Sequence, residues 1–193
     1  MYKRQAHIHL NGTLTGRLDG VPLSDAGREQ AQALAERLGG EAIDHVATSP
    51  RERARDTGAA IARAARAGEP ETDAVFDEID FGDWTGRRFA ELDGDPAWDK
   101  WNAYRATAAA PNAETAAAAQ ARALAGLRRL AGKHEGGIVA VVTHCDIIRS
   151  VVCGVLELSL DHLLRFDCDA ASVTRIAVAS HGDRLISLNE RTA

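Results

Sequence analysis

The amino-acid sequence predicts a three-layer α/β/α sandwich built around a mostly parallel sheet. Short apolar runs alternate with longer helical patterns along the chain, as they do when each crossover helix returns the chain to a parallel strand. Residues 138–143 form a continuous run of apolar and β-branched residues, which is typical of a strand buried on both faces. With 193 residues, the chain is long enough to bury a core of its own.

The first part of the chain predicts two helices separated by one strand. Ser24 is a favourable N-cap for a helix whose apolar residues recur three and four positions apart and which stops at a Gly-Gly pair. Residues 43–48 then predict a short strand. Ser49 followed by Pro50 predicts a second helix, with the serine as N-cap and the proline in the first turn, that runs to about residue 67.

The middle of the chain predicts shorter elements. Residues 74–76 are apolar and predict another short strand. Asp95 and Pro96 are residue types that open helices, and Trp98 and Trp101 follow at a spacing that puts both on one helical face. We therefore expect a short aromatic helix in this region.

The last part of the chain predicts alternating helices and strands and then a hairpin. A long helix rich in alanine and leucine is predicted for residues 114–133, followed by the buried strand 138–143. Residues 146–156 predict another helix. Two strands, at residues 172–179 and 184–188, flank a turn that contains glycine and aspartate, which predicts a hairpin.

We expect a single domain over residues 1–193, because the sequence contains no internal repeat and no disordered linker. Within this domain, residues 84–113 carry the aromatic helix and are predicted to form a lid or cap segment.

Composition excludes several classes of partner. The net charge is −5, and the arginines are scattered among acidic neighbours, so binding of nucleic acid is not expected. No apolar run approaches the roughly 20 residues of a membrane-spanning helix, and no signal-peptide pattern opens the chain. We therefore expect a cytoplasmic protein without membrane association. Cys145, Cys153 and Cys168 form no Cys-x-x-Cys pair and are interpreted as reduced, buried thiols.

Side chains capable of chemistry follow the predicted strands, where the ligand crevice of an open α/β sheet lies. His144 comes directly after the buried strand and opens a helix, whose N–H groups favour an anion. Arg51 and Arg53 follow the first strand, and cations in the first turn of a helix oppose its dipole unless an anion binds between them. We take Arg53 as the phosphate ligand. Glu78 lies among aromatic residues, where burial raises the pKa of a carboxyl group and makes it a general acid.

Each of these residues also has a structural interpretation. A lone histidine at a strand end is more often structural than catalytic, and an arginine on a helix surface is usually solvated. The aspartates near Glu78 suggest a metal site as a competing hypothesis. Because no histidines occur at matching spacing, we predict no metal.

Together, these motifs resemble those of the histidine phosphatase superfamily, in its phosphoglycerate mutase-like branch, over nearly the whole chain. Residues 49–57 resemble the family's Ser-Pro-x-x-Arg-Ala-x-x-Thr motif, which implies that Arg53 binds phosphate. His144 matches the family's second active-site histidine, which implies a catalytic and a phosphate-binding role. Glu78 precedes a turn similar to the family's Phe/Tyr-Gly-x-Trp-x-Gly, which implies that it is the general acid. The resemblance implies a phosphoglycerate mutase-like fold.

Residues 111–115 resemble a variant of the family's Pro-Gly-Gly-Glu-Ser/Thr turn without its two glycines.

The family's defining motif, Arg-His-Gly/Ala-x-Thr-x-x-Asn, falls on residues 4–11. Arg4, Ala6 and Asn11 match it, which implies that Arg4 and Asn11 bind phosphate. Gln5 stands at the catalytic position where the family has the histidine that becomes phosphorylated. A glutamine amide is not a nucleophile, so no phosphoenzyme forms on it.

An apolar central strand precedes this motif in family members, whereas only three residues precede Arg4 here. We therefore expect a truncated N-terminal central strand, and we expect residues 1–5 to be non-native.

The resemblance implies a phosphomonoester hydrolase that acts on a small phosphorylated metabolite through a phosphohistidine and needs no cofactor. With Gln5 at the nucleophile position, the chain as written is expected to be inactive. Two alternatives stay open at this point: a phosphoester-binding pseudoenzyme and a phosphoglycerate mutase-type phosphotransferase.

Overall fold

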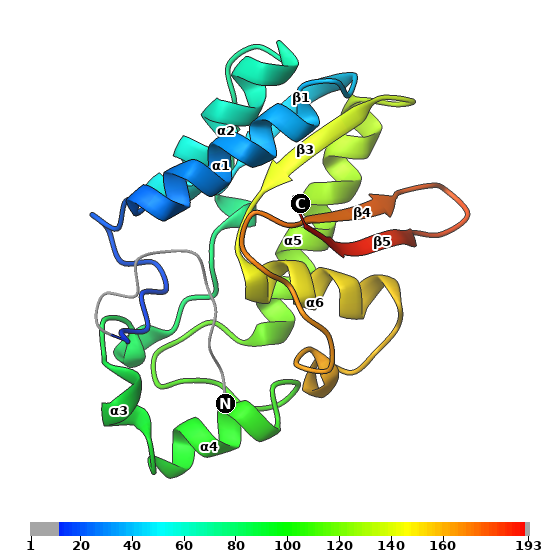
Figure 1. Ribbon diagram of the computed structural model, residues 1–193. Helices are drawn as coiled ribbons and strands as arrows, with labels where there is room; N and C mark the ends of the chain where they lie inside the picture. The colour runs from blue at the N-terminus through cyan, green and yellow to red at the C-terminus, as the bar shows by residue number, and fades with distance from the viewer. Residues whose placement is uncertain (1–11, 192–193) are drawn as a thin grey trace.

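The computed structural model describes residues 12–191, whose strands form two sheets. β1 (Ile43–Thr48) lies between β2 (Glu71–Thr72) and β3 (Ile138–Val142) in a parallel sheet. β4 (Val173–Ala177) and β5 (Arg184–Glu190) form an antiparallel hairpin, as predicted, on the side of β3 that faces away from β1 (Figure 1).

Helices cover the parallel sheet on both sides. α1 (Asp25–Leu38) and α2 (Glu52–Ala65) pack against each other on one side. α5 (Ala116–Lys133) lies on the other side, with α6 (Cys145–Val155) packed beside it (Figure 1). The Ser24 hydroxyl accepts the Gly27 N–H at 2.9 Å, which confirms the predicted N-cap of α1.

Successive residues of β1 point into the two halves of the core. Val46 lies in a cluster with Leu34 of α1 and Ile61 of α2, whereas Ala47 lies in a different cluster with Leu130 of α5. This alternation is the expected consequence of the two-residue period of a strand. The predicted α/β/α sandwich is therefore confirmed.

The predicted N-cap of α2 is wrong. α2 begins at Glu52, with Arg51 as its N-cap and no side-chain cap, instead of beginning directly after Ser49. The Ser49 hydroxyl accepts the Arg51 N–H at 3.3 Å, ahead of the helix, and also contacts His144 and Asp77.

Two other predicted elements differ in the structure. Residues 74–76 form a 3₁₀ turn (η1, Ala74–Phe76) instead of a strand, because the Asp73 carboxylate accepts the Val75 N–H at 3.0 Å and closes the turn. The long helix starts at Ala116 instead of residue 114, because Thr115 caps it by accepting the Ala118 N–H.

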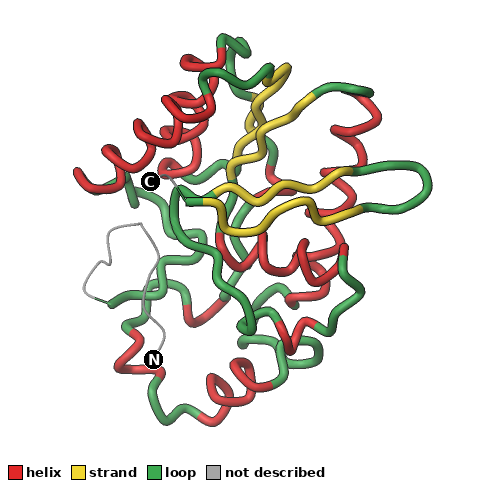
Figure 2. The backbone as a smooth tube through the Cα atoms, turned by 45° about the vertical axis from the view of Figure 1, so that its right-hand side comes forward, coloured by secondary structure: helices red, strands yellow, loops and turns green. Residues whose placement is uncertain are grey.

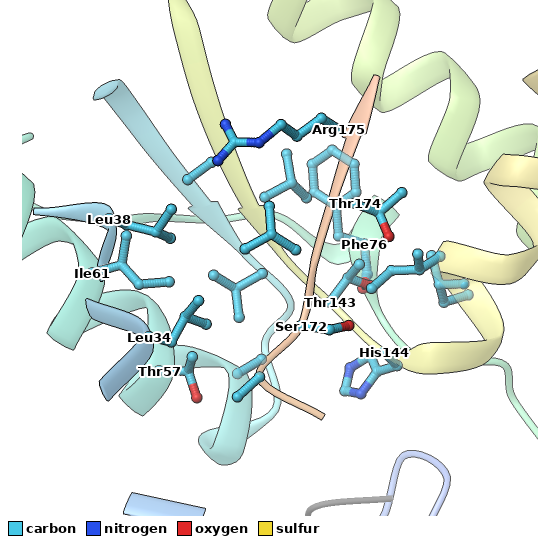
Figure 3. Close-up of a pocket in the computed structure, with 18 of the residues that line it drawn as sticks. Leu34, Leu38, Thr57, Ile61, Phe76, Thr143, His144, Ser172, Thr174 and Arg175 are labelled. Atoms are coloured by element: carbon cyan, nitrogen blue, oxygen red, sulfur yellow. The ribbon is translucent and has the colours of Figure 1, made fainter. Parts of the chain in front are cut away.

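β3 is less buried than predicted. Among residues 12–191, β3 pairs only with β1, and residues 139–142 are only partly buried. Its other edge faces a mainly apolar cavity of about 420 Å³, which β4, α1 and α2 also line (Figure 3). The cavity occupies the space where a strand buried on both faces would have a packed neighbour.

Residues 84–113 contain two short helices, α3 (Phe89–Leu92) and α4 (Pro96–Ala103), at the end of the molecule away from α1 and α2 (Figure 2). Trp101 is fully buried and meets Trp84 and Phe81 edge to face. The segment is therefore firmly packed, and its role as a lid stays a prediction. In the part of the chain that the structure describes, no helix has the length and apolar character needed to cross a membrane.

The turn at residues 111–115 forms without the two glycines of the family pattern. Asn112 takes a left-handed conformation, with φ of 55°, which asparagine tolerates better than most residues. Its side-chain amide donates to Asp83 at 3.1 Å. Gly82, opposite this turn, also has a positive φ, and a Cβ there would overlap the Pro111 carbonyl oxygen.

Candidate active site

The candidate site lies at the carboxyl ends of two neighbouring parallel strands. β1 and β3 are in register at Thr48 and Val142, so the residues that follow them emerge at the same edge of the sheet. Ser49 follows β1, and Thr143 and His144 follow β3. The segments that follow β1 and β3 therefore bring the Ser49 hydroxyl and the His144 imidazole together.

His144 is the buried centre of this group. It is the N-cap residue of α6, in an extended backbone conformation that directs the ring away from the helix. The ring atom Nε2 lies 2.7 Å from Ser49 Oγ, and Nδ1 lies 3.2 Å from Arg53 Nη2. Its neighbours therefore hold both ring nitrogens in place. Figure 3 shows the ring at one end of the cavity beside β3.

Arg53 extends from the first turn of α2 and is 5% exposed. Its Nη2 donates to the Gly16 carbonyl oxygen at 2.9 Å and also faces His144. Within the described residues, the buried Nε and Nη1 atoms have no hydrogen-bond partner. Burial lowers the pKa of Arg53, but an arginine stays charged in proteins, so the group is a buried cation with donors to spare.

Glu78 faces the same ring atom of His144 as Arg53 does and is 3% exposed. Its Oε2 is 3.8 Å from His144 Nδ1, and its Oε1 accepts the Ile79 N–H at 2.9 Å. Burial, followed by the negative charge of Asp146, raises the pKa of Glu78 to about 8. At neutral pH, this carboxyl group therefore carries the proton that a general acid needs.

The structure adds Asp77 and Ser49, whose roles the sequence did not reveal. One carboxylate oxygen of Asp77 accepts the Glu78 N–H at 2.8 Å and the Ser49 hydroxyl at 3.2 Å. Asp77 and Ser49 therefore orient Glu78 and His144. Asp77 directly precedes Glu78, but Ser49, which contacts it, is 28 residues away in sequence. No local sequence pattern therefore predicts this contact.

Two further arginines surround the site, but acidic residues neutralise them. Arg51 lies 3.1 Å from Asp77 and 2.8 Å from Asp19. Arg17 donates to the Glu78 carbonyl oxygen at 2.7 Å and pairs with Glu114 at 2.9 Å. Of the two cations predicted at the start of α2, Arg51 is paired with acidic side chains, whereas Arg53 keeps two donor atoms that have no hydrogen-bond partner among the described residues.

Three of the residues singled out in the sequence, Arg4, Gln5 and Asn11, lie outside the residues that the structure describes. Between residues 12 and 191, no group of three or more histidine, cysteine or acidic side chains is arranged to hold a metal ion.

This arrangement favours a tetrahedral anion. Arg53 supplies a cation, and α2 and α6 both begin at the site without a side-chain cap, so their N-terminal N–H groups and dipoles favour negative charge. Glu78 supplies a proton close to the same point. A cation, a neutral acid and an imidazole within one buried cluster are the groups needed to bind and protonate an ester of phosphate.

Comparisons with known proteins agree with this chemistry. The sequence model described as "Histidine phosphatase superfamily (branch 1)" matches residues 5–191. The chain is 29% identical over 188 residues to "Phosphoserine phosphatase 1" of Hydrogenobacter thermophilus, an alignment that covers 95% of this chain and 89% of the relative. It is 36% identical over 142 residues to "Phosphoglycerate mutase-like protein 4" of Arabidopsis thaliana, covering 72% and 61% of the two chains. The solved structure of YhfR from Bacillus stearothermophilus superimposes with a TM-score of 0.86 at 27% identity, over 94% of this chain and 91% of that one.

Proposed function

Because the chain belongs to the histidine phosphatase superfamily (branch 1), we propose that its site binds the phosphoryl group of a small phosphate monoester and that the ester is hydrolysed when a histidine stands at position 5. The similarity to a phosphoserine phosphatase over most of both chains supports hydrolysis of a small phosphorylated metabolite.

One observation carries this proposal: in the part of the chain that the structure describes, the Nε and Nη1 atoms of the buried Arg53 have no hydrogen-bond partner, while its Nη2 lies 3.2 Å from Nδ1 of His144, the ring atom that Glu78 also faces. Unpaired buried donors on a cation are costly unless a ligand uses them. A phosphoryl oxygen is the acceptor that an arginine fork fits best.

Hydrolysis follows in two steps that use these groups. In the first, a histidine at position 5 attacks phosphorus, so a nitrogen–phosphorus bond forms as the ester phosphorus–oxygen bond breaks, and Glu78 gives its proton to the leaving alkoxide. In the second, water gives a proton to the Glu78 carboxylate and attacks phosphorus, and the nitrogen–phosphorus bond breaks. Arg53 and His144 stabilise the charge on the phosphoryl oxygens in both steps.

Gln5 favours a second candidate function. Since an amide forms no phosphoenzyme, the chain as written is expected to bind phosphate esters and turn them over very slowly, which is the behaviour of a phosphoester-binding pseudoenzyme. The two functions share the binding site and differ only in the covalent step.

Binding of inorganic phosphate, measured by calorimetry, tests the shared part. We expect the chain to bind phosphate and Arg53→Gln to weaken binding by about 10- to 100-fold, because a hydrogen bond to a charged group contributes about 1.5–3 kcal/mol.

Arg55→Gln is the matched control, since Arg55 lies on the same helix, carries the same charge and is exposed. This variant should bind phosphate within about twofold of the parent chain, because exposed charges contribute little. Equal losses in both variants would mean that net charge, and not this site, binds the anion.

A further inference from the structure

Two arginines from distant parts of the chain hold the main chain of Glu78, and neither takes part in the steps described above. Arg17 Nε donates to the Glu78 carbonyl oxygen at 2.7 Å, and Nη2 of Arg122, from α5, donates to the same oxygen at 3.1 Å. Arg122 Nη1 also donates to the Val75 carbonyl oxygen at 2.7 Å. We call Arg17 and Arg122 the guanidinium clamp.

Glu114 joins the two halves of the clamp. Its Oε2 accepts hydrogen bonds from Nη2 of Arg17 and Nη2 of Arg122, both at 2.9 Å, and its Oε1 accepts one from Arg122 Nε at 2.7 Å. The Glu114 N–H donates to the Asp80 carbonyl oxygen at 3.1 Å, which fixes the glutamate beside the loop that carries Glu78. Glu114 belongs to the turn of residues 111–115, to which the proposed function gives no role.

Other carboxylates lie near one half of the clamp only. Asp77 and Asp80 lie 3.6 and 3.7 Å from Arg17, farther than Glu114 does. Among residues 12–191, Glu114 is the one acidic side chain that pairs with both guanidinium groups. Its removal should therefore leave Arg122 without an acidic partner and Arg17 with its two weaker ones.

The peptide group that the clamp holds also contacts the Glu78 carboxyl group. The Glu78 carbonyl and the Ile79 N–H belong to one planar peptide unit and point in opposite directions. Two charged donors on the carbonyl oxygen fix this unit firmly. Its N–H is thereby directed to the other side, where it donates to Glu78 Oε1 at 2.9 Å. A rotation of the peptide unit would turn the N–H away from the carboxyl group.

We propose that Glu114 is a positioning residue, which holds the guanidinium clamp together and through it orients the Glu78 carboxyl group. The use of that carboxyl group as an acid rests on the proposed function, but the contacts between Glu114 and the clamp do not. The turn of residues 111–115 thereby contributes to the site through the main chain of Glu78.

Hydrogen exchange of the Ile79 amide, followed by NMR, tests the clamp directly in the chain as it stands. Glu114→Gln should speed this exchange by about 10-fold or more relative to the amides of β1, because it loosens both guanidinium groups and with them the peptide unit. Arg17→Gln removes one half of the clamp and should give a smaller change in the same direction. This variant supplies the same measurement if Glu114→Gln does not fold.

The Ile79 amide shift gives a second measurement. In the parent chain it should change with pH as Glu78 ionises, because the carboxyl group accepts this N–H, and Glu78→Gln should abolish the change. In Glu114→Gln the amplitude of the change should shrink, since the N–H no longer points steadily at the carboxyl group. An amplitude equal to that of the parent would contradict the proposal.

Glu41→Gln is the matched control. Glu41 also pairs with an arginine through both carboxylate oxygens, at 2.8 and 2.6 Å from Arg175, and it is likewise partly buried. Glu41→Gln should destabilise the fold to a comparable degree and leave the Ile79 amide unchanged. Equal acceleration of exchange in both variants, or none in Glu114→Gln, would overturn the proposal.

The choice of leaving group separates this proposal from the proposed function. In chains with histidine at position 5, Glu114→Gln should slow hydrolysis of an alkyl phosphate at least about 10-fold more than that of p-nitrophenyl phosphate, because p-nitrophenolate leaves without a proton from the acid. Equal losses on both esters would contradict a role in orienting the acid. Failure of every histidine-bearing chain to hydrolyse either ester would contradict the proposed function, whereas the Ile79 exchange rates would still decide the role of Glu114.

Discussion

At the scale of single residues, Glu78 makes the stability of the fold depend on pH. The pKa of its carboxyl group is about 8 in the folded chain, against an ordinary value of 4.5. Between these two values the unfolded chain has released the proton and the folded chain has kept it. Stability contributed by this group is therefore full below about pH 4.5 and is lost as the pH rises toward 8.

We therefore expect Glu78→Gln to stabilise the protein at pH 8, because the amide fills the same space and never ionises. The gain should be on the order of a few kcal/mol, seen as a thermal midpoint several degrees higher. At pH 4, where the carboxyl group is protonated in both states, the difference should largely vanish.

Glu114→Gln provides the opposite case for this measurement. Arg122 and Arg17 hold the pKa of Glu114 below its usual range despite partial burial, so its stabilising contribution is present at neutral pH and is lost as the pH falls through the folded-state pKa. Glu114→Gln should destabilise the protein at pH 8. A Glu78→Gln chain that is also less stable at pH 8 would contradict the assigned environment of Glu78.

At the scale of elements, the close approach of α2 to β1 positions Arg53. Gly58 is buried one turn after Arg53, and a Cβ at this position would overlap Thr48 Cγ2. The glycine lets α2 lie directly on β1, the strand that ends at Thr48. The position of α2, and therefore the approach of Arg53 to His144, depends on Gly58 having no side chain.

We expect Gly58→Ala to lower the free energy of unfolding by about 1–3 kcal/mol, because the extra carbon forces the helix and strand apart. Chemical denaturation measures this change, and weaker phosphate binding should accompany it. Gly132→Ala is the control, since Gly132 lies in α5 with no atom near the added carbon, and alanine there should stabilise the helix by about 0.5–1 kcal/mol. Similar changes in both variants would show that packing of α2 on β1 is not tight.

At the scale of the whole molecule, the two sheets are separated by the cavity of about 420 Å³. Within the described chain, β3 pairs only with β1, and β4 pairs only with β5, so both strands present an unpaired edge. The lining combines apolar side chains of β3 with those of α1 and α2, and His144 lies at one end (Figure 3). An extended apolar segment would satisfy both edges and fill this space.

We therefore predict that replacing residues 1–5 by an apolar, β-branched strand ending in Leu-Val-Arg-His raises both stability and phosphatase rate. Each apolar side chain buried should contribute about 1.5–3 kcal/mol, partly offset by the cost of ordering the backbone. The covalent nucleophile should raise turnover of a generic phosphomonoester on the order of 10⁴-fold.

Two further chains complete this comparison of thermal midpoint and rate. Gln5→His alone restores the nucleophile but not the strand, so we expect little gain in either quantity. A strand of equal length with serine and asparagine at the apolar positions should fail to stabilise the fold. Full activity from Gln5→His alone would show that the fold does not need the added strand, and a stable but inactive strand-containing chain would favour the pseudoenzyme.

The sequence correctly predicted the elements that depend on a strong local pattern. The cap at Ser24, the strand of residues 43–48 and the C-terminal hairpin all formed as expected, because each depends on residues close together in sequence. The cap predicted at Ser49 and the strand predicted at residues 74–76 were wrong. In the first case the Ser49 hydroxyl accepts the Arg51 N–H ahead of the helix and also contacts His144, 95 residues away, which no local pattern shows.

By itself, the sequence determined the layered α/β architecture and the family resemblance, and it predicted Arg53, Glu78 and His144 as candidate site residues, since periodicity and motif spacing are properties of the chain. The tertiary structure alone decided that Ser49 and Asp77 contact His144 and Glu78 and that, among the residues it describes, a cavity lies between the sheets. The physical reason is that burial and charge interactions depend on distance in space, and parallel strands bring together residues that are far apart in sequence.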